Sequence, residues 1–208
     1  MIPTLYDYWR SSAAYRVRIA LNLLDQPYTS IPVNLLAAEH RAPANLARNP
    51  QGLVPTLDID GLTLTQSVAI IEYLNETRAA GFLPADPAGR AKVRALAYAI
   101  AMDLAPICNL SVRNHAAALS NGAVSADDWV RHFMGPGLQA FEVMLGANSR
   151  FCHGDGLTMA DIVLVPQIYN ARRLGLDLAS MPRITAITAA LDAIPAIAAA
   201  HPDRHAPT

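Results

Sequence analysis

Short apolar runs alternate with helically spaced apolar positions along residues 1–80. Runs rich in β-branched and aromatic residues predict strands, and apolar residues that recur every three or four positions predict helices. The predicted strands are Thr4–Tyr8, Tyr28–Val33, Val54–Asp58 and Leu62–Thr65. The predicted helices are Ala14–Leu24, Glu39–Arg48 and Ser67–Glu76. The expected order is therefore βαβαββα, and Asp60-Gly61 predicts a hairpin turn between the last two strands.

The pattern changes at residues 77–89, which contain two prolines and two glycines and show no periodicity. Such a segment is typical of a linker, so we expect a domain boundary there, with domains at residues 1–80 and 88–208. A helix is expected from Asp86-Pro87 to about His115, because Asp favours the N-cap and Pro the first helical position.

Capping residues and prolines mark the later helix starts. Ser125–Asp128 and Thr158–Asp161 each place a hydroxyl residue three positions before an Asp, which is a capping-box pattern. Pro182 and Pro195 precede two short final helices. No strand is predicted after residue 88, so the chain is expected to be a small α/β domain followed by an all-α helical bundle.

Composition narrows the classes of function. Hydrophobic residues make up 52% of the 208 residues and the formal charge is -1, which excludes global disorder and gives no electrostatic attraction to nucleic acid or acidic membranes. Polar residues and prolines interrupt every apolar stretch before the ~20 residues of a membrane span. The first residues lack a secretory signal pattern, so we expect a cytoplasmic protein. Cys108 and Cys152 lack metal-ligand spacing, and we expect structural thiols and no metal site.

Two hydroxyl residues, Ser11 and Ser12, lie where the first predicted strand gives way to the first helix. A helix N-terminus combines free N–H groups with the positive end of the helix dipole, and this favours an anion. The two hydroxyls therefore either cap the helix, which this segment alone favours, or help to hold a small anion such as a thiolate.

Ser67 begins a second helix of the same domain and offers the same chemistry. Its hydroxyl and the free N–H groups suit a carboxylate, and Gln66 adds an amide donor. Val54, just before Pro55, offers a backbone N–H and C=O to an extended peptide. The alternative for Ser67 is a plain helix cap, but its neighbours favour binding.

Three longer motifs resemble the glutathione transferase superfamily. They are Asn49–Leu57, Gln66–Leu74 and Phe151–Asp161. The resemblance implies a thioredoxin-like first domain, a cis-proline at Pro55, glutathione as cofactor and the γ-glutamyl group at Gln66 and Ser67. It also implies a homodimer. We expect glutathione to bind between the two domains, because two helix N-termini and the Val54-Pro55 turn converge on it.

Further segments resemble the zeta class of that superfamily, which includes maleylacetoacetate and maleylpyruvate isomerases. They are Arg10–Leu21, Asp103–Val112 and Val165–Arg173. The resemblance implies a catalytic group of Ser11, Ser12 and Arg10, glutathione contacts from Gln51, Val54, Pro55, Gln66, Ser67 and Asn109, and substrate contacts from Arg10 and Arg173. We expect Ser11 to stabilise the thiolate and Ser12 to cap or support the helix.

The chain departs from the zeta pattern at three positions. Ala13 replaces a cysteine, Ala105 a histidine and Ser111 an arginine. The first change matters least, because the attacking sulfur belongs to glutathione. The last removes a cation for a substrate carboxylate, which leaves Arg10 and Arg173 for that purpose. Each of these has the alternative of a solvated surface charge, and only the resemblance favours Arg173 over its neighbour Arg172.

Three functions follow. The first is a glutathione-dependent cis–trans isomerase of a maleyl-type keto acid. The second is a zeta-like transferase or dehalogenase that acts on another electrophile, which Ala105 and Ser111 would suit. The third is a non-catalytic interaction protein with a glutathione-binding fold, which would not need Ser11, Val54-Pro55 and Gln66-Ser67 together.

Overall fold

The computed structural model describes residues 2–146 and 149–207. Contacts between Cα atoms divide the chain into two compact units. Unit 1 is Met1–Phe82 with Asp192–Thr208, and unit 2 is Leu83–Leu191. The last segment, which the sequence pattern placed in the helical domain, therefore makes its contacts within unit 1.

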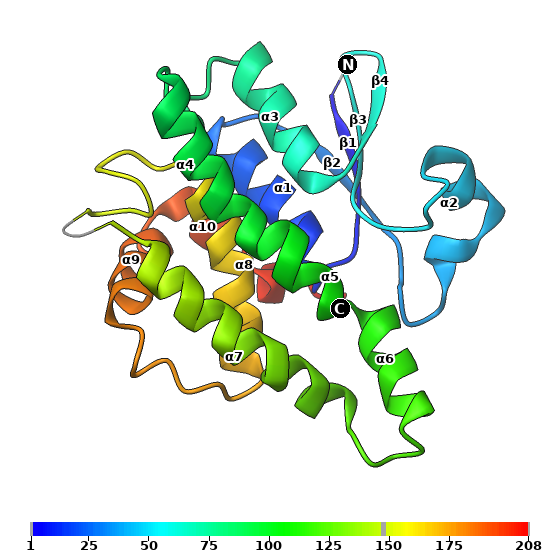
Figure 1. Cartoon of the computed structure of the whole chain (residues 1–208). Helices are drawn as coiled ribbons and strands as arrows, with labels where there is room; N and C mark the ends of the chain where they lie inside the picture. Colours follow the sequence, from blue (N-terminus) through cyan, green and yellow to red (C-terminus); the bar gives the residue numbers. More distant parts are fainter. Residues whose placement is uncertain (1, 147–148, 208) are drawn as a thin grey trace. The chain divides into compact units, whose positions relative to one another are not determined.

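Unit 1 contains a four-stranded mixed sheet (Figure 1). Its strands are β1 Thr4–Asp7, β2 Thr29–Pro32, β3 Thr56–Ile59 and β4 Leu62–Thr65, in the order β2-β1-β3-β4. β1 pairs in parallel with β2, whereas β1–β3 and β3–β4 are antiparallel. Asp60 and Gly61 both have positive φ, 53° and 78°, as a tight hairpin turn requires. The predicted hairpin and the thioredoxin-like βαβαββα order are confirmed.

Unit 1 also contains helices. They are α1 Ser12–Leu23, η1 Glu39–Arg41, α2 Pro43–Arg48, α3 Ser67–Thr77, α10 Pro195–Ala199 and η3 Pro202–Arg204. α1 packs against α3 and α10, and α2 lies on the other side of the strands from α1 and α3 (Figure 1). The prediction of one helix over Glu39–Arg48 is wrong, because Ala42 is extended (φ -64°, ψ 147°). The following Pro43 disfavours helical geometry at Ala42.

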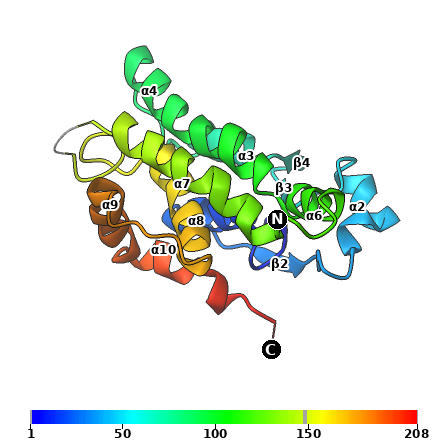
Figure 2. The same cartoon turned by 60° about the horizontal axis from the view of Figure 1, so that its bottom comes forward.

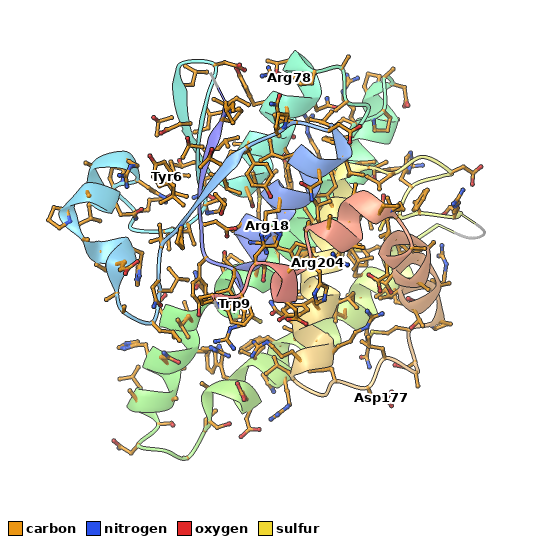
Figure 3. All side chains as sticks on the ribbon, turned by 180° about the vertical axis from the view of Figure 1, so that it is seen from behind. Tyr6, Trp9, Arg18, Arg78, Asp177 and Arg204 are labelled. Carbon is orange, nitrogen blue, oxygen red and sulfur yellow. The ribbon has the colours of Figure 1, made fainter. Side chains whose placement is uncertain are left out.

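Arg18 links the C-terminal segment of unit 1 to the first part of that unit (Figure 3). Its side chain is fully buried and pairs with Asp7 of β1 at 2.5 Å. The same guanidinium donates to the carbonyl oxygens of Trp9 (2.9 Å) and Ala200 (3.1 Å). A buried charge is tolerated only when it is paired and hydrogen-bonded, and these three acceptors meet that requirement.

Unit 2 is built from helices, of which α7 (Ala126–Met144) runs beside the stretch Pro87–Ile107 (Figures 1 and 2). In chain order, the helices of unit 2 are α4 Pro87–Tyr98, the π-helical η2 Ala99–Leu104, α5 Ala105–Ile107, α6 Leu110–Leu119, α7 Ala126–Met144, α8 Met159–Arg173 and α9 Pro182–Asp192. The single helix expected to reach His115 is interrupted, since Asn109 is extended (φ -63°, ψ 148°). Pro106 lacks an N–H and clashes with the preceding turn, which accounts for the widened geometry before it.

The predicted helix starts of unit 2 are confirmed. The Asp86 carboxylate accepts the N–H of Gly89 at 2.7 Å, and the Ser125 hydroxyl accepts the N–H of Asp128 at 3.0 Å. At α8, Thr158 and Asp161 form a reciprocal capping box, and Asp161 also accepts the N–H of Cys152 at 2.8 Å. Burial raises the pKa of Asp161, although the backbone N–H groups of Cys152 and Thr158 act in the opposite direction.

Within the described ranges, no single helix is long and apolar enough to cross a membrane. The segments Pro87–Ile107 and Leu110–Leu119 are long and apolar enough only when taken together, and their axes are bent by 41° relative to each other.

Candidate functional site

Ser11 is the N-cap of α1. Its backbone is extended (φ -67°, ψ 120°), and its hydroxyl oxygen accepts the N–H of Ala14 at 3.2 Å. Ser12 is the first residue of the helix, so of the two roles expected for it, to cap or to support the helix, the cap belongs to Ser11 instead. A hydroxyl that accepts one hydrogen bond still has its own O–H to donate. Capping by Ser11 and donation from Ser11 to an anion are therefore compatible.

Arg10 lies next to this cap and is partly buried. Its guanidinium stacks over the Trp9 ring, with 4.7 Å from the guanidinium carbon to the ring centroid. No carboxylate in the described part of the chain forms an ion pair with Arg10. A cation–π contact holds an Arg side chain in place without neutralising its charge. Arg10 therefore retains the capacity to pair with an anionic ligand.

The start of α3 is built differently. Gln66 precedes the helix with a positive φ of 67°, and its side chain makes no capping hydrogen bond. Its amide nitrogen instead donates to Oε1 of Gln51 at 2.7 Å. Positive φ is costly for a residue with a Cβ atom, and the bond to Gln51 is one interaction that holds Gln66 there. Two side chains that the sequence assigned separately to glutathione are thus in direct contact.

Ser67 is buried, with 5% of its surface exposed, and its hydroxyl oxygen accepts a hydrogen bond from Nη1 of Arg16 at 3.3 Å. Arg16 belongs to α1 and is itself 3% exposed. Burial lowers the pKa of Arg16 to about 10, so the guanidinium remains charged at neutral pH. Sequence reasoning missed Arg16. The available signal was its helical spacing from Ala20, which places a charged residue on the apolar face of α1.

The loop before β3 is shaped by Asn49. Its side-chain nitrogen donates to the carbonyl of Leu53 at 3.0 Å, and its side-chain oxygen accepts the N–H of Gln51 at 3.1 Å. The Val54-Pro55 peptide bond is cis, as the resemblance implied. Val54 packs in a small apolar cluster with buried Tyr8 and Val33 and with partly buried Tyr6, Trp9 and Leu35. Apolar packing thus supports the segment that carries the backbone groups of Val54.

The remaining predicted site residues belong to unit 2. Asn109 is the N-cap of α6, and its side chain makes no capping hydrogen bond. Arg172 and Arg173 both lie exposed in the last turn of α8. Cations there also interact favourably with the helix dipole. Exposure alone does not separate the two arginines.

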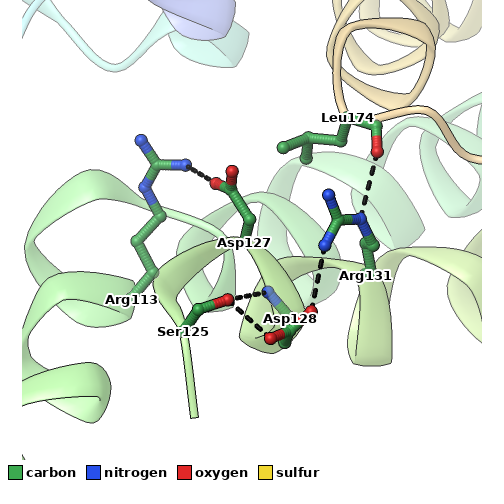
Figure 4. A network of polar contacts seen from close by, with 6 residues as sticks. All are labelled: Arg113, Ser125, Asp127, Asp128, Arg131 and Leu174. Carbon is green, nitrogen blue, oxygen red and sulfur yellow. Dashed lines mark hydrogen bonds and ion pairs between the residues drawn. The ribbon is translucent and has the colours of Figure 1, made fainter. Parts of the chain in front are cut away.

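The Ser111 position lies in a shallow surface hollow of α6 and α7. The hollow is lined by Ser111, Val112, His115, Ala116, Leu119 and Trp129. Arg113, two residues further along α6, pairs with Asp127 of α7 at 3.3 Å (Figure 4). Arg113 therefore does not replace the arginine that Ser111 lacks.

Both cysteines have strongly disfavoured thiolates. They are free, and Cys152 is buried. Burial raises the pKa of Cys108 to about 11 and raises that of Cys152 well above its ordinary value. Both thiols are therefore protonated at neutral pH. Neither cysteine therefore offers a resting thiolate.

Comparisons with known proteins agree with the fold. The family model described as "Glutathione S-transferase, N-terminal domain" matches residues 5–81. The maleylacetoacetate isomerase of Rhizobium meliloti (strain 1021) is 59% identical over 207 residues, which cover 98% of this chain and 97% of that protein. The maleylacetoacetate isomerase of Pseudomonas aeruginosa is 44% identical over 202 residues, 95% of each chain.

Solved structures extend the similarity across both units. A holo structure of a maleylpyruvate isomerase, described as a bacterial glutathione S-transferase in the zeta class, is 40% identical with a TM-score of 0.90, and the match covers 96% of each chain. The maleylacetoacetate isomerase from Anaeromyxobacter dehalogenans 2CP-1 with bound glutathione is 44% identical with a TM-score of 0.86, covering 97% of this chain and 95% of that one. The chain therefore belongs to the zeta class of the glutathione transferase superfamily.

Proposed function

We propose that this protein is a glutathione-dependent cis–trans isomerase that converts a maleyl-type keto acid, maleylacetoacetate or maleylpyruvate, into its fumaryl isomer. The observation that carries the proposal is the 59% identity to a maleylacetoacetate isomerase over 98% of this chain. The match spans 97% of that protein as well, so it extends over both units.

The residues of unit 1 fit glutathione. The start of α3 offers N–H groups that have no partner within the helix, together with the Ser67 hydroxyl and the Gln66 and Gln51 amides. These groups suit the carboxylate of the γ-glutamyl end. The backbone of Val54 suits the extended peptide of glutathione.

Glutathione supplies, when bound, the thiolate that adds reversibly to the cis double bond of the substrate and thereby permits rotation about it. The chain contributes the means to form and keep the thiolate. Ser11 donates its O–H to the sulfur, and the N-terminus of α1 adds a positive potential. Ser12 supports the first turn of the same helix.

Arg10 and Arg173 hold the substrate carboxylates in this proposal. Arginine suits this role because its planar guanidinium pairs with a carboxylate through two hydrogen bonds. Arg10 also places a cation beside Ser11, where negative charge develops on the substrate after sulfur addition. Asn109 completes the set of glutathione contacts.

The second candidate function is a zeta-like glutathione transferase or dehalogenase. It is favoured by one observation: Ser111 lies in a mostly apolar hollow where the zeta pattern has an arginine. Such a surface suits a less charged electrophile than a keto diacid.

The test is an assay of the purified protein with maleylacetoacetate, maleylpyruvate and chlorinated acids, each with and without glutathione. We expect isomerisation of a maleyl compound that requires glutathione but does not consume it. Consumption of glutathione with release of chloride, and no isomerisation, would favour the second candidate. Retention on immobilised glutathione without turnover of any compound would favour a non-catalytic protein.

We further propose that the protein is a cytoplasmic homodimer, which rests on its membership of the class. Equilibrium sedimentation at micromolar concentration should give twice the 22.3 kDa of one chain. A mass equal to that of one chain would contradict the dimer.

A further inference from the structure

Arg16 is a buried cation without a counter-ion among the residues that the structure describes. Its only hydrogen bond to a described residue is the one from Nη1 to Ser67, and its Nε and Nη2 atoms are buried without a partner. Arg18, two residues further along the same helix, is a buried arginine whose hydrogen-bond donors have acceptors. It has a carboxylate and two carbonyl oxygens as acceptors. Burying a charge without such partners is costly.

The position of Arg16 adds to this cost. Its guanidinium contacts the first residue of α3, where the helix dipole is already positive. Two positive potentials therefore converge on Ser67. Burial lowers the pKa of Arg16, and no carboxylate of the described chain acts to raise it. An anion bound at the start of α3 would neutralise both potentials at once.

We propose that Arg16 is a positioning residue for the carboxylate of the γ-glutamyl end of glutathione, acting through Ser67. This inference rests on the proposed function. Because the Ser67 oxygen accepts from Arg16, its hydroxyl hydrogen is free to donate to the ligand. The charged donor behind it polarises the hydroxyl and strengthens that second hydrogen bond. Arg16 thus orients Ser67 and supplies positive charge without touching the ligand.

The test measures how much the α-carboxylate of the γ-glutamyl residue contributes to the affinity for glutathione. The probes are glutathione and γ-aminobutyryl-cysteinyl-glycine, which is glutathione without the α-carboxylate of its γ-glutamyl residue. Titration calorimetry gives the Kd of each probe for the wild type, Arg16→Met and Arg16→Lys. Arg48→Met is the matched control, since it removes a cation from the same unit that stacks on Tyr6. Thermal unfolding without ligand shows whether each variant is folded.

We expect the wild type to prefer glutathione by about tenfold or more, the range of a hydrogen bond to a charged group. In Arg16→Met this preference should fall to less than about threefold, while Arg16→Lys retains part of it and Arg48→Met all of it. The melting temperature of Arg16→Met should not fall below that of the wild type, because an unpaired buried charge is removed.

Three results would overturn the inference. One is an Arg16→Met protein that keeps the full preference for glutathione. Another is an equal weakening of both probes together with a lower melting temperature, which is the signature of a purely structural arginine. The third is a wild type that binds the two probes equally. If the wild type isomerises its substrate in any of these cases, the proposed function stands and only the role of Arg16 fails. A wild type that binds neither probe contradicts the proposed function itself.

Discussion

The two helices of unit 1 that begin with serine differ in how their first turns are satisfied. At α1 the Ser11 hydroxyl accepts a backbone N–H of its own helix. At α3 the Ser67 hydroxyl accepts instead from the buried Arg16 of another helix, and Gln66 provides no cap. Ser11 is the N-cap of its helix and Ser67 is the first residue of its helix, so the first end has a side-chain cap and the second does not.

The difference has an energetic consequence. A capped N-terminus contributes about 1 kcal/mol to stability without any ligand. An uncapped N-terminus backed by a cation is less favourable in the free protein and gains more when an anion binds. In the proposed function, the α1 end thus serves both stability and chemistry, whereas the α3 end serves binding.

Ser11→Ala should have the largest effect. We expect kcat/KM for isomerisation to fall by about 10²-fold or more, because one lost donor to a developing or stabilised anion typically costs this much. The free energy of unfolding should also fall by about 1 kcal/mol, since the structure assigns the cap to Ser11. Ser12→Ala is the matched control and should change kcat/KM far less.

The pKa of bound glutathione, followed by thiolate absorbance in the ultraviolet, separates the two roles of Ser11. It should rise in Ser11→Ala and remain nearly unchanged in Ser12→Ala. The reverse ranking would move the chemical role to Ser12. Small and equal changes would mean that the helix dipole and backbone N–H groups suffice.

Ser67→Ala should have an intermediate effect, confined to binding. We expect the Kd for glutathione to rise about tenfold, the value of a hydrogen bond to a charged group, with kcat at saturating glutathione little changed. Ser67→Thr, which keeps the hydroxyl, is the control. A fall in kcat without a change in Kd would break the distinction between the two helix ends.

Gln51→Ala should have the smallest effect. It removes an exposed hydrogen bond to Gln66 and one amide from the proposed glutathione site. Because exposed neutral hydrogen bonds contribute about 1 kcal/mol or less, we expect the Kd for glutathione to rise by no more than about fivefold. Calorimetry measures the change, and a larger rise than in Ser67→Ala would show that the amides dominate binding.

Local signals in the sequence predicted the elements of the fold well. Asp60-Gly61 specified the hairpin, and Asp86, Ser125 and Thr158 marked helix starts that the structure confirms. The failures are interruptions inside helical patterns, at Ala42 and at Asn109. Both lie close to a proline, and periodicity of apolar residues carries no information about such breaks.

The site was predicted only in part, for a different reason. Gln51, Gln66 and Ser67 were recognisable from motifs close together in the chain. The contact between Arg16 and Ser67 joins residues 51 positions apart and buries a side chain that is normally assigned to the surface. Only the packing of α1 against α3 creates it.

The bonds that Arg18 makes also bear on when unit 1 can complete its folding during synthesis. Its guanidinium needs the carbonyl of Ala200, and α1 packs against α10. Ribosomes add about 5–20 residues per second, and domains usually fold as units while they emerge. Unit 1 cannot complete its folding before unit 2 is synthesised, because its C-terminal segment, Asp192–Thr208, follows unit 2 in the chain. A truncated protein that ends at the predicted domain boundary would therefore expose one side of α1 and leave a buried arginine short of an acceptor.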